Sequence, residues 1–223
     1  MSKSRRNYED SYRHKGLRKQ LMDIIREKGI SDEEVLAAMN NVPRHFFLDT
    51  AMDNIAYEDR AFPIAEGQTI SQPYTVAYQT ELLQLKPHDK VLEIGTGSMY
   101  QASVLAEMGA RVYTIERQKV LFDKTKDYFF KQKYPHLKFF YGDGYLGLPT
   151  FAPFDKILIT AAAPYIPSQL VDQLKVGGKM VVPLDEDDQQ RMLRITRNAD
   201  GTIAEEAFSR FSFVPMLTGK NGN

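Results

Sequence analysis

At 223 residues, with 43% hydrophobic and 26% charged side chains, the chain has an ordinary globular composition and suffices for one domain. Its 29 basic and 29 acidic residues cancel, which excludes a global field that would attract nucleic acid or an anionic membrane. Cysteine is absent, which excludes disulfides, thiolate metal sites and a cysteine nucleophile. No apolar run approaches the roughly 18 residues of a membrane span, and residues 1–20 lack a signal peptide's apolar core, so we expect a cytoplasmic protein.

The first part of the chain is predicted to be helical. Residues 1–16 are basic, and we expect them to form a flexible terminus in front of a single domain at 17–223. Within 17–86, the stretch LRKQLMDII places its apolar residues on one helical face. Ser31 and Glu34 have the spacing of a capping box before VLAAM, and Pro43 ends this pattern.

From residue 88 onward, short apolar runs alternate with helix-like segments at 99–108, 117–133 and 166–175. Near-continuous apolar strands between helices indicate a parallel sheet covered on both faces. Two later runs, RMLRITR and EAFSRFSFVPM, alternate like an antiparallel pair. We therefore predict an α/β doubly wound, Rossmann-like sheet over 87–223, with antiparallel C-terminal strands and an N-terminal helical extension. The predicted parallel strands are VLEI, RVYTIE, LKFFY, DKILIT and KMVVPL.

The run VLEIGTGSMYQ (91–101) places a glycine-rich turn between the first strand of this sheet and a helix. Gly95, Thr96 and Gly97 form the turn, where glycine permits tight geometry and close approach of a ligand. The second strand ends in Glu116, 21 residues after Gly95, and an acid there suits a ribose diol. Ligands of such sheets bind beyond the carboxyl ends of the strands, so we expect one nucleoside site here.

S-adenosylmethionine fits this predicted site better than a dinucleotide does. The dinucleotide fingerprint needs glycine at its sixth position, where this chain has Tyr100. S-adenosylmethionine carries no phosphate, so a G-x-G turn and a ribose acid are sufficient for it. The third strand closes with YGDG (141–144), where Asp143 can accept from the adenine amino group while the backbone N–H of Gly144 meets a ring nitrogen.

Several longer stretches, in chain order, resemble the protein-L-isoaspartate O-methyltransferase family. The resemblance runs from about Leu17 to Pro215, and GQTISQP joined to EIGTGS is far more specific than a general methyltransferase pattern. It implies an S-adenosylmethionine-dependent enzyme that methylates the free carboxylate of L-isoaspartyl, and more weakly D-aspartyl, residues in damaged proteins. The stretches are VPRHFF, AYEDRAFPI, GQTISQPYTVA, VLEIGTGS, GDGYLG and TAAAPYIP.

The resemblance also implies roles for individual residues. Ser71 of TISQP matches the family's active-site serine. From the residues alone, Ser71 either caps the helix that Pro73 begins or orients a substrate carboxylate at that helix end. The cofactor contacts that the resemblance implies are Gly95, Gly97, Glu116, Asp143 and Gly144.

The chemistry of an isoaspartyl substrate agrees with the residues that the chain offers. Its carboxylate has a pKa of about 3.5, so it is ionised at neutral pH and needs no general base. The protein has only to place this oxygen against a methyl donor in a dry pocket, where neutral hydrogen bonds suit a transition state that loses charge. The four histidines are scattered along the sequence, so we expect packing or surface roles for them and no metal site.

Two other functions remain open from the sequence. One is a methyltransferase of the same fold that acts on a small molecule or RNA, although TAAAP lacks the (N/D)-P-P-(Y/F) cluster of many N-methyltransferases. The other is a non-catalytic relative that has lost the cofactor. We expect isoaspartyl proteins and peptides as partners, no nucleic acid or membrane, and a monomer.

Met99 stands where the family pattern has glycine. Whether its side chain leaves room for the cofactor decides between an active methyltransferase and a non-catalytic relative. We expect right-handed helical geometry at Met99, in the first turn of its helix, because backbone φ is normally negative there. Its side chain would then lean toward the cofactor and fold aside at modest cost, leaving the site open. On this basis Met99→Gly would tighten cofactor binding about five-fold.

Overall fold

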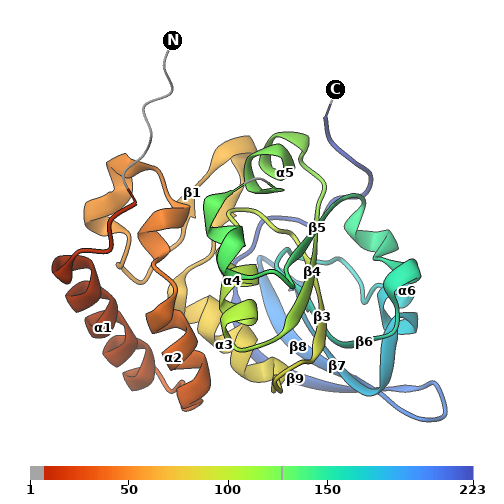
Figure 1. Ribbon diagram of the computed structural model, residues 1–223. Helices are drawn as coiled ribbons and strands as arrows, with labels where there is room; N and C mark the ends of the chain where they lie inside the picture. The colour runs from red at the N-terminus through yellow and green to blue at the C-terminus, as the bar shows by residue number, and fades with distance from the viewer. Residues whose placement is uncertain (1–7, 127, 223) are drawn as a thin grey trace.

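The computed structural model describes residues 8–126 and 128–222 (Figure 1). The predicted flexible terminus is too long, because helix α1 begins at Tyr12 and not beyond residue 16. Ser11 is its N-cap, with a hydroxyl that accepts from the amide of His14. The side chains of His14 and Arg18 are buried, which fixes this helix to the rest of the domain. The rest of the predicted terminus, residues 1–7, lies outside the described residues.

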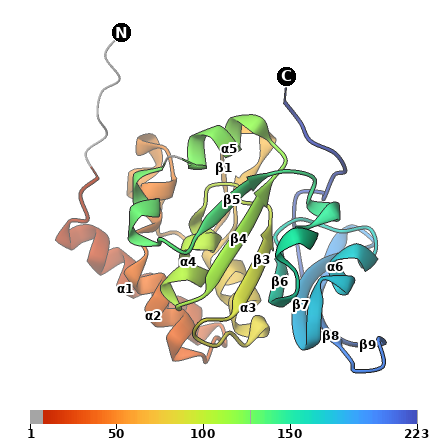
Figure 2. The ribbon, with the colours of Figure 1, turned by 45° about the vertical axis from the view of Figure 1, so that its right-hand side comes forward.

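The predicted sheet is confirmed. Seven strands form one sheet in the order β5-β4-β3-β6-β7-β8-β9, which Figure 2 shows from β5 across to β9. Pairing is parallel from β5 through β7, and β8 and β9 are antiparallel additions. A separate antiparallel pair joins β1 to β2. The strands are β1 Phe62–Pro63, β2 Thr69–Ile70, β3 Lys90–Ile94, β4 Arg111–Glu116, β5 Lys138–Tyr141, β6 Phe154–Ile159, β7 Leu174–Glu186, β8 Gln189–Arg197 and β9 Ile203–Phe211.

The helices between the strands of the sheet follow the predicted segments but are shorter. The helix predicted over 117–133 divides into α5 and a 3₁₀ turn at Phe129–Lys133. After α5, the rings of Tyr128 and Phe130 pack against Phe46 and Phe47. The α-helices are α1 Tyr12–Glu27, α2 Glu33–Asn41, α3 Pro73–Leu83, α4 Tyr100–Glu107, α5 Lys119–Lys126 and α6 Ser168–Asp172.

Hydrophobic packing covers the sheet on both faces, as near-continuous apolar strands require. Helices α3 and α4 lie on one face, and α1 and α2 pack outside them to form a helical layer (Figure 1). Helix α6 and the segment 144–152 cover the opposite face. Strand β3 has Val91, Leu92 and Ile94 buried at the centre, so the carboxyl end of β3 meets both layers.

The predicted capping box at the start of α2 is wrong. Asp32, and not Ser31, is the N-cap, and its carboxylate accepts from the amide of Glu34 at 2.9 Å. The amides of Ser31 and Asp32 both donate to Glu81 of α3, each at 2.8 Å. The contact with Glu81 therefore gives the backbone amide of Ser31 a partner, which the predicted capping box would have supplied from Glu34.

Two of the histidines that are scattered in the sequence meet in the helical layer. The rings of His14 and His45 stack at 3.9 Å, and Asp10 lies close enough for the three to be a candidate metal group. His14 Nε2 lies 2.9 Å from Asp53, and His45 Nδ1 lies 2.6 Å from the Tyr57 hydroxyl. The Asp10 carboxylate is itself paired with an arginine. These hydrogen bonds and the ring stacking support the predicted packing role of the two histidines.

Within the described residues, no helix has both the length and the apolar character needed to cross a membrane.

Candidate active site

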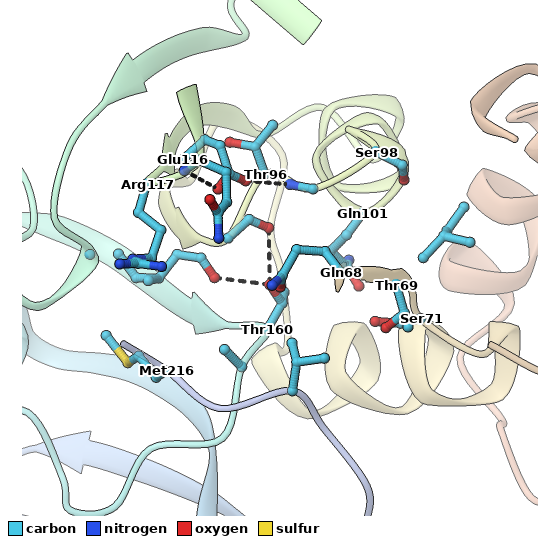
Figure 3. A pocket seen from close by; sticks show the side chains of 18 of the residues that line it. Gln68, Thr69, Ser71, Thr96, Ser98, Gln101, Glu116, Arg117, Thr160 and Met216 are labelled. Atoms are coloured by element: carbon cyan, nitrogen blue, oxygen red, sulfur yellow. Dashed lines mark hydrogen bonds between the residues drawn. The ribbon is translucent and has the colours of Figure 1, made fainter. Parts of the chain in front are cut away.

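A cavity that opens to solvent lies at the carboxyl ends of β3, β4 and β6. This is where the strand order reverses, since β3 is flanked by β4 on one side and β6 on the other. Figure 3 shows Ser71 and Thr69 on one side of the cavity and Glu116 with Arg117 on another. The wall is built mainly from segments 68–71, 94–98, 115–118, 160–161 and 214–217.

Gly95 occupies a position that no other residue could take without strain. Its φ is +101°, and a Cβ there would lie 2.5 Å from the Thr160 hydroxyl. That hydroxyl donates to the carbonyls of Ile94 and Gly95, at 2.9 and 3.0 Å. The first glycine of the turn therefore lets β6 hold the end of β3 in place.

Glu116 is buried and directed at the same turn. One carboxylate oxygen accepts from the amide of Gly97 and the other from the amide of Gln118, both at 2.8 Å. Burial raises the pKa of Glu116, and the amide donors oppose this effect. Each oxygen retains acceptor capacity. A diol that donated to both would be held by a carboxylate whose position is already fixed.

Ser71 lies on the cavity wall between β2 and α3, and it does not cap the helix. Gln72 is the N-cap and makes no side-chain capping bond. The Ser71 hydroxyl has no hydrogen-bond partner within residues 8–126 and 128–222, whereas its carbonyl accepts from Arg44 at 2.8 Å. The backbone of Ser71 is therefore held while its hydroxyl remains available to a ligand.

The start of α3 is already occupied by a carboxylate of the protein. Asp59 accepts from the amide of Tyr74 at 2.8 Å, and its other oxygen pairs with Lys28 at 2.6 Å. Gln72 also donates to Asp59, at 3.1 Å. The expectation that this helix end would receive the substrate carboxylate is therefore wrong, because Asp59 takes the favourable position.

Gly144 lines the cavity, but Asp143 does not. The two Asp143 oxygens accept from the amides of Tyr145 and Gly219, at 2.9 and 2.6 Å. The C-terminal segment thus covers Asp143, and Arg117 secures this segment by donating to the Gly219 carbonyl at 3.0 Å. A Cβ at Gly144 would lie 2.4 Å from Ile94, so close packing requires glycine there.

The structure brings six of the seven predicted residues to one cavity: Ser71, Gly95, Thr96, Gly97, Glu116 and Gly144. Residues that were not predicted complete it. Thr160 begins TAAAPYIP, one of the stretches that resemble the family, but no role was predicted for its side chain. The segment 214–217 reaches the site through backbone bonds between Ala162 and both Val214 and Met216. No local pattern marks that contact in the sequence.

Comparison with known proteins decides which family this site belongs to. The family model for protein-L-isoaspartate(D-aspartate) O-methyltransferase matches residues 16–221. A protein-L-isoaspartate O-methyltransferase from Cytophaga hutchinsonii is 56% identical over 214 residues, which cover 96% of each chain. The chain belongs to the protein-L-isoaspartate (D-aspartate) O-methyltransferase family. The family predicted from the sequence motifs is confirmed.

Further relatives agree with this result. A protein-L-isoaspartate O-methyltransferase from Salinibacter ruber is 45% identical over 221 residues, covering 95% of each chain. The crystal structure of a protein-L-isoaspartate O-methyltransferase from Plasmodium falciparum, in complex with S-adenosyl-L-homocysteine, is similar with a TM-score of 0.79. It is 27% identical and covers 90% of this chain and 98% of that one. The fold predicted from the sequence is thereby confirmed as well.

The backbone of Met99 does not have the right-handed helical conformation that was predicted from the sequence. It is the N-cap of α4 with φ 75° and ψ 1°, a left-handed conformation that favours glycine. Its side chain is fully buried in the core between the sheet and the helical layer, and it does not line the cavity. Met99 therefore adds conformational strain and core packing, and it leaves the cavity open.

Glu93 is a buried acid directly beneath the turn of the O-methyltransferase site. Oxygen Oε2 accepts from the Thr114 hydroxyl at 2.5 Å, and that hydroxyl lies 2.7 Å from the hydroxyl of Thr96. Oxygen Oε1 has no partner within the described part of the chain. Burial raises the pKa of Glu93 to about 8, with a smaller contribution from Glu116, so its carboxyl group is neutral at pH 7.

We expect Met99→Gly to destabilise the protein and to leave cofactor affinity within about three-fold. Loss of a fully buried methionine costs about 2–5 kcal/mol, and relief of the left-handed conformation returns about 1–2 kcal/mol. Urea denaturation measures the change, with Met99→Ala as the control. Alanine loses the same packing but keeps the strain, so it should be the less stable variant. Equal stability of the two variants would contradict a strained Met99.

We expect the stability gained by Glu93→Gln, relative to the natural protein, to grow as pH rises. In the folded state Glu93 stays protonated to about pH 8, whereas in the unfolded chain it ionises near pH 4.5. Its contribution is thus present below pH 4.5 and is lost as pH rises to 8, by about 1.4 kcal/mol per pH unit. Urea denaturation from pH 5.5 to 7.5 should therefore show a difference that widens by about 2–3 kcal/mol. Parallel curves would mean that folding does not shift this pKa.

Proposed function

We propose that this protein methylates the free carboxylate of L-isoaspartyl, and more weakly D-aspartyl, residues in damaged proteins, with S-adenosylmethionine as methyl donor. It is a protein carboxyl O-methyltransferase, and the methyl ester begins repair of the damaged residue. The observation that carries the proposal is the family match over residues 16–221, together with a cavity that joins the turn 94–98 to Ser71. Monomeric state and independence from nucleic acid remain predictions.

The residues of the cavity fit S-adenosylmethionine, which supplies a methyl group on a positively charged sulfur when it is bound. Glu116 would hold the ribose diol, since both of its oxygens are fixed and can accept further bonds. The backbone at Gly95, Thr96 and Gly97 allows close approach. Gly144 would lie against the adenine, and Asp143 would act there through the segment that it holds in place.

The protein's own contribution to the reaction is to position the substrate. An isoaspartyl carboxylate is ionised at neutral pH, so no residue has to remove a proton. Among the cavity-lining residues in the described part of the chain, the charged side chains are Glu116 and Arg117, which follow each other at the end of β4. On the side of Ser71 the polar lining is neutral, with Gln68 and Thr69 next to it. A neutral donor can orient the carboxylate without resisting its loss of charge.

The proposal is tested with two peptides that differ only at one residue, isoaspartyl in one and aspartyl in the other. Labelled S-adenosylmethionine should transfer its methyl group to the isoaspartyl peptide alone. If the cofactor binds but neither peptide is labelled, the protein is a methyltransferase of the same fold with another substrate, such as a small molecule or RNA. If the cofactor does not bind at millimolar concentration, the enzyme function is wrong.

We expect Glu116→Ala to weaken S-adenosylmethionine binding by about 1.5–3 kcal/mol, the usual contribution of a charged hydrogen bond. Isothermal titration calorimetry measures this change. Glu205→Ala is the control, because Glu205 is exposed on β9, far from the cavity lining. Unchanged affinity in Glu116→Ala would remove Glu116 from the cofactor site.

We expect Ser71→Ala to lower kcat on the isoaspartyl peptide about ten-fold or more, with little change in cofactor affinity. The physical reason is that its hydroxyl orients only the reacting carboxylate, so its loss affects the chemical step. Ser209→Ala on the exposed strand β9 serves as the control. A fully active Ser71→Ala enzyme of normal stability would show that the hydroxyl has no part in the reaction.

A further inference from the structure

Arg44 is a charged side chain buried completely in the helical layer. It opens the 3₁₀ turn Arg44–Phe47, and its exposed fraction is 0%. Its Nη2 donates to the carbonyl of Ser71 at 2.8 Å and, more weakly, to that of Arg60 at 3.4 Å. Its Nε and Nη1 have no hydrogen-bond partner of ordinary geometry within the described residues. No carboxylate of the described chain bonds to it directly.

This arrangement is unfavourable for stability. Burial lowers the pKa of Arg44 to about 10, so the guanidinium is still charged at neutral pH. Partial compensation comes from the electrostatic attraction of Tyr100, whose ring centroid lies 5.0 Å from the guanidinium carbon, and of the Asp59 carboxylate. A buried charge with two unpartnered donors is costly, and an apolar side chain of similar size commonly gives an equal or more stable protein. The stability of the fold does not account for an arginine at this position.

The contacts of Arg44 connect three segments, two of which line the cavity. Ser71 belongs to the segment between β2 and α3, and Tyr100 begins α4 and lines the cavity. Arg60 belongs to the loop that also carries Asp59, the residue that holds the start of α3. The guanidinium is planar, and its donors have a fixed geometry, so one side chain can set these segments relative to each other.

We infer that Arg44 is a positioning residue for methyl transfer, which fixes the Ser71 carbonyl and thereby directs the Ser71 hydroxyl toward the reacting carboxylate. This inference rests on the role proposed above for Ser71. Arg44 does not line the cavity, so it acts through Ser71 and not on the substrate itself. Strand pairing holds the preceding residue and Asp59 holds Gln72, whereas the carbonyl bond from Arg44 is the hydrogen bond found for Ser71 itself within the described residues.

The test combines Arg44→Leu with Ser71→Ala in a double-mutant cycle on the isoaspartyl peptide. Arg44→Leu should lower kcat about ten-fold or more, leave S-adenosylmethionine affinity within about two-fold, and leave the urea midpoint unchanged or higher. Arg44→Lys, which keeps a donor but loses the planar fork, should have an intermediate kcat. In the double variant, kcat should be no lower than about half that of Ser71→Ala, because the hydroxyl to be positioned is already absent.

Arg18→Leu is the matched control, since Arg18 is also a buried arginine of the helical layer. It binds Asp10 and Tyr57 and does not contact Ser71. Arg18→Leu should lower the urea midpoint, because it leaves Asp10 unpaired, while kcat of the folded protein stays within about two-fold.

The outcomes separate this inference from the function on which it rests. If Ser71→Ala is impaired and Arg44→Leu has full kcat, only the inference fails. If the losses in the double variant multiply, Arg44 acts independently of Ser71, and the inference also fails. If Ser71→Ala is fully active, the proposed role of Ser71 is wrong, and the inference about Arg44, which depends on that role, is wrong as well. Should Arg44→Leu not fold, the same cycle with Arg44→Lys decides by the same criterion.

Discussion

The active site depends on the way in which the two central strands end together. Strands β3 and β6 are neighbours, but the chain leaves them toward opposite layers, so a gap opens beyond their carboxyl ends. The Thr160 hydroxyl bridges this gap by donating to the carbonyls of Ile94 and Gly95. Because Gly95 lacks a Cβ, Thr160 can come this close, and the turn that follows is directed at Glu116.

The helical layer contributes more than cover for one face of the sheet. It places Asp59 at the start of α3 and Arg44 behind Ser71, so two buried ionic groups hold the segment that opposes the cofactor turn. Both groups sit behind the wall and not on it. On the side of Ser71, these two charges therefore lie one layer behind the cavity wall, and the wall itself is neutral there, which suits the proposed step, in which opposite charges cancel.

The two buried glutamates near the turn at 94–98 also differ in whether they reach the cavity. Glu93 is neutral at pH 7 because its burial opposes ionisation, and it bonds to Thr114, which lies beside Thr96. Glu116 is nearly as buried, but backbone amides supply donors to both of its oxygens. Glu93 and Glu116 both lie near the turn at Gly95–Gly97, but only Glu116 accepts hydrogen bonds from backbone amides at both carboxylate oxygens. Only Glu116 lines the cavity where a ligand could meet it.

The sequence by itself determined the strands of the parallel sheet, the turn at Gly95 and Gly97, and the family, since these depend on local periodicity and on contiguous motifs. The order of the strands in the sheet came only from the structure. Glu116 was expected beside the glycine turn because parallel strands end at the same edge, whereas Ser71 was assigned to the site only by the resemblance to the family. Only the tertiary structure decided the burial of Met99 in the core, the bonds of Glu81 and Asp59 to backbone amides at the starts of α2 and α3, and the covering of Asp143. Each of these is a contact between residues far apart in the chain, where burial and hydrogen bonding outweigh the local preference from which they were predicted.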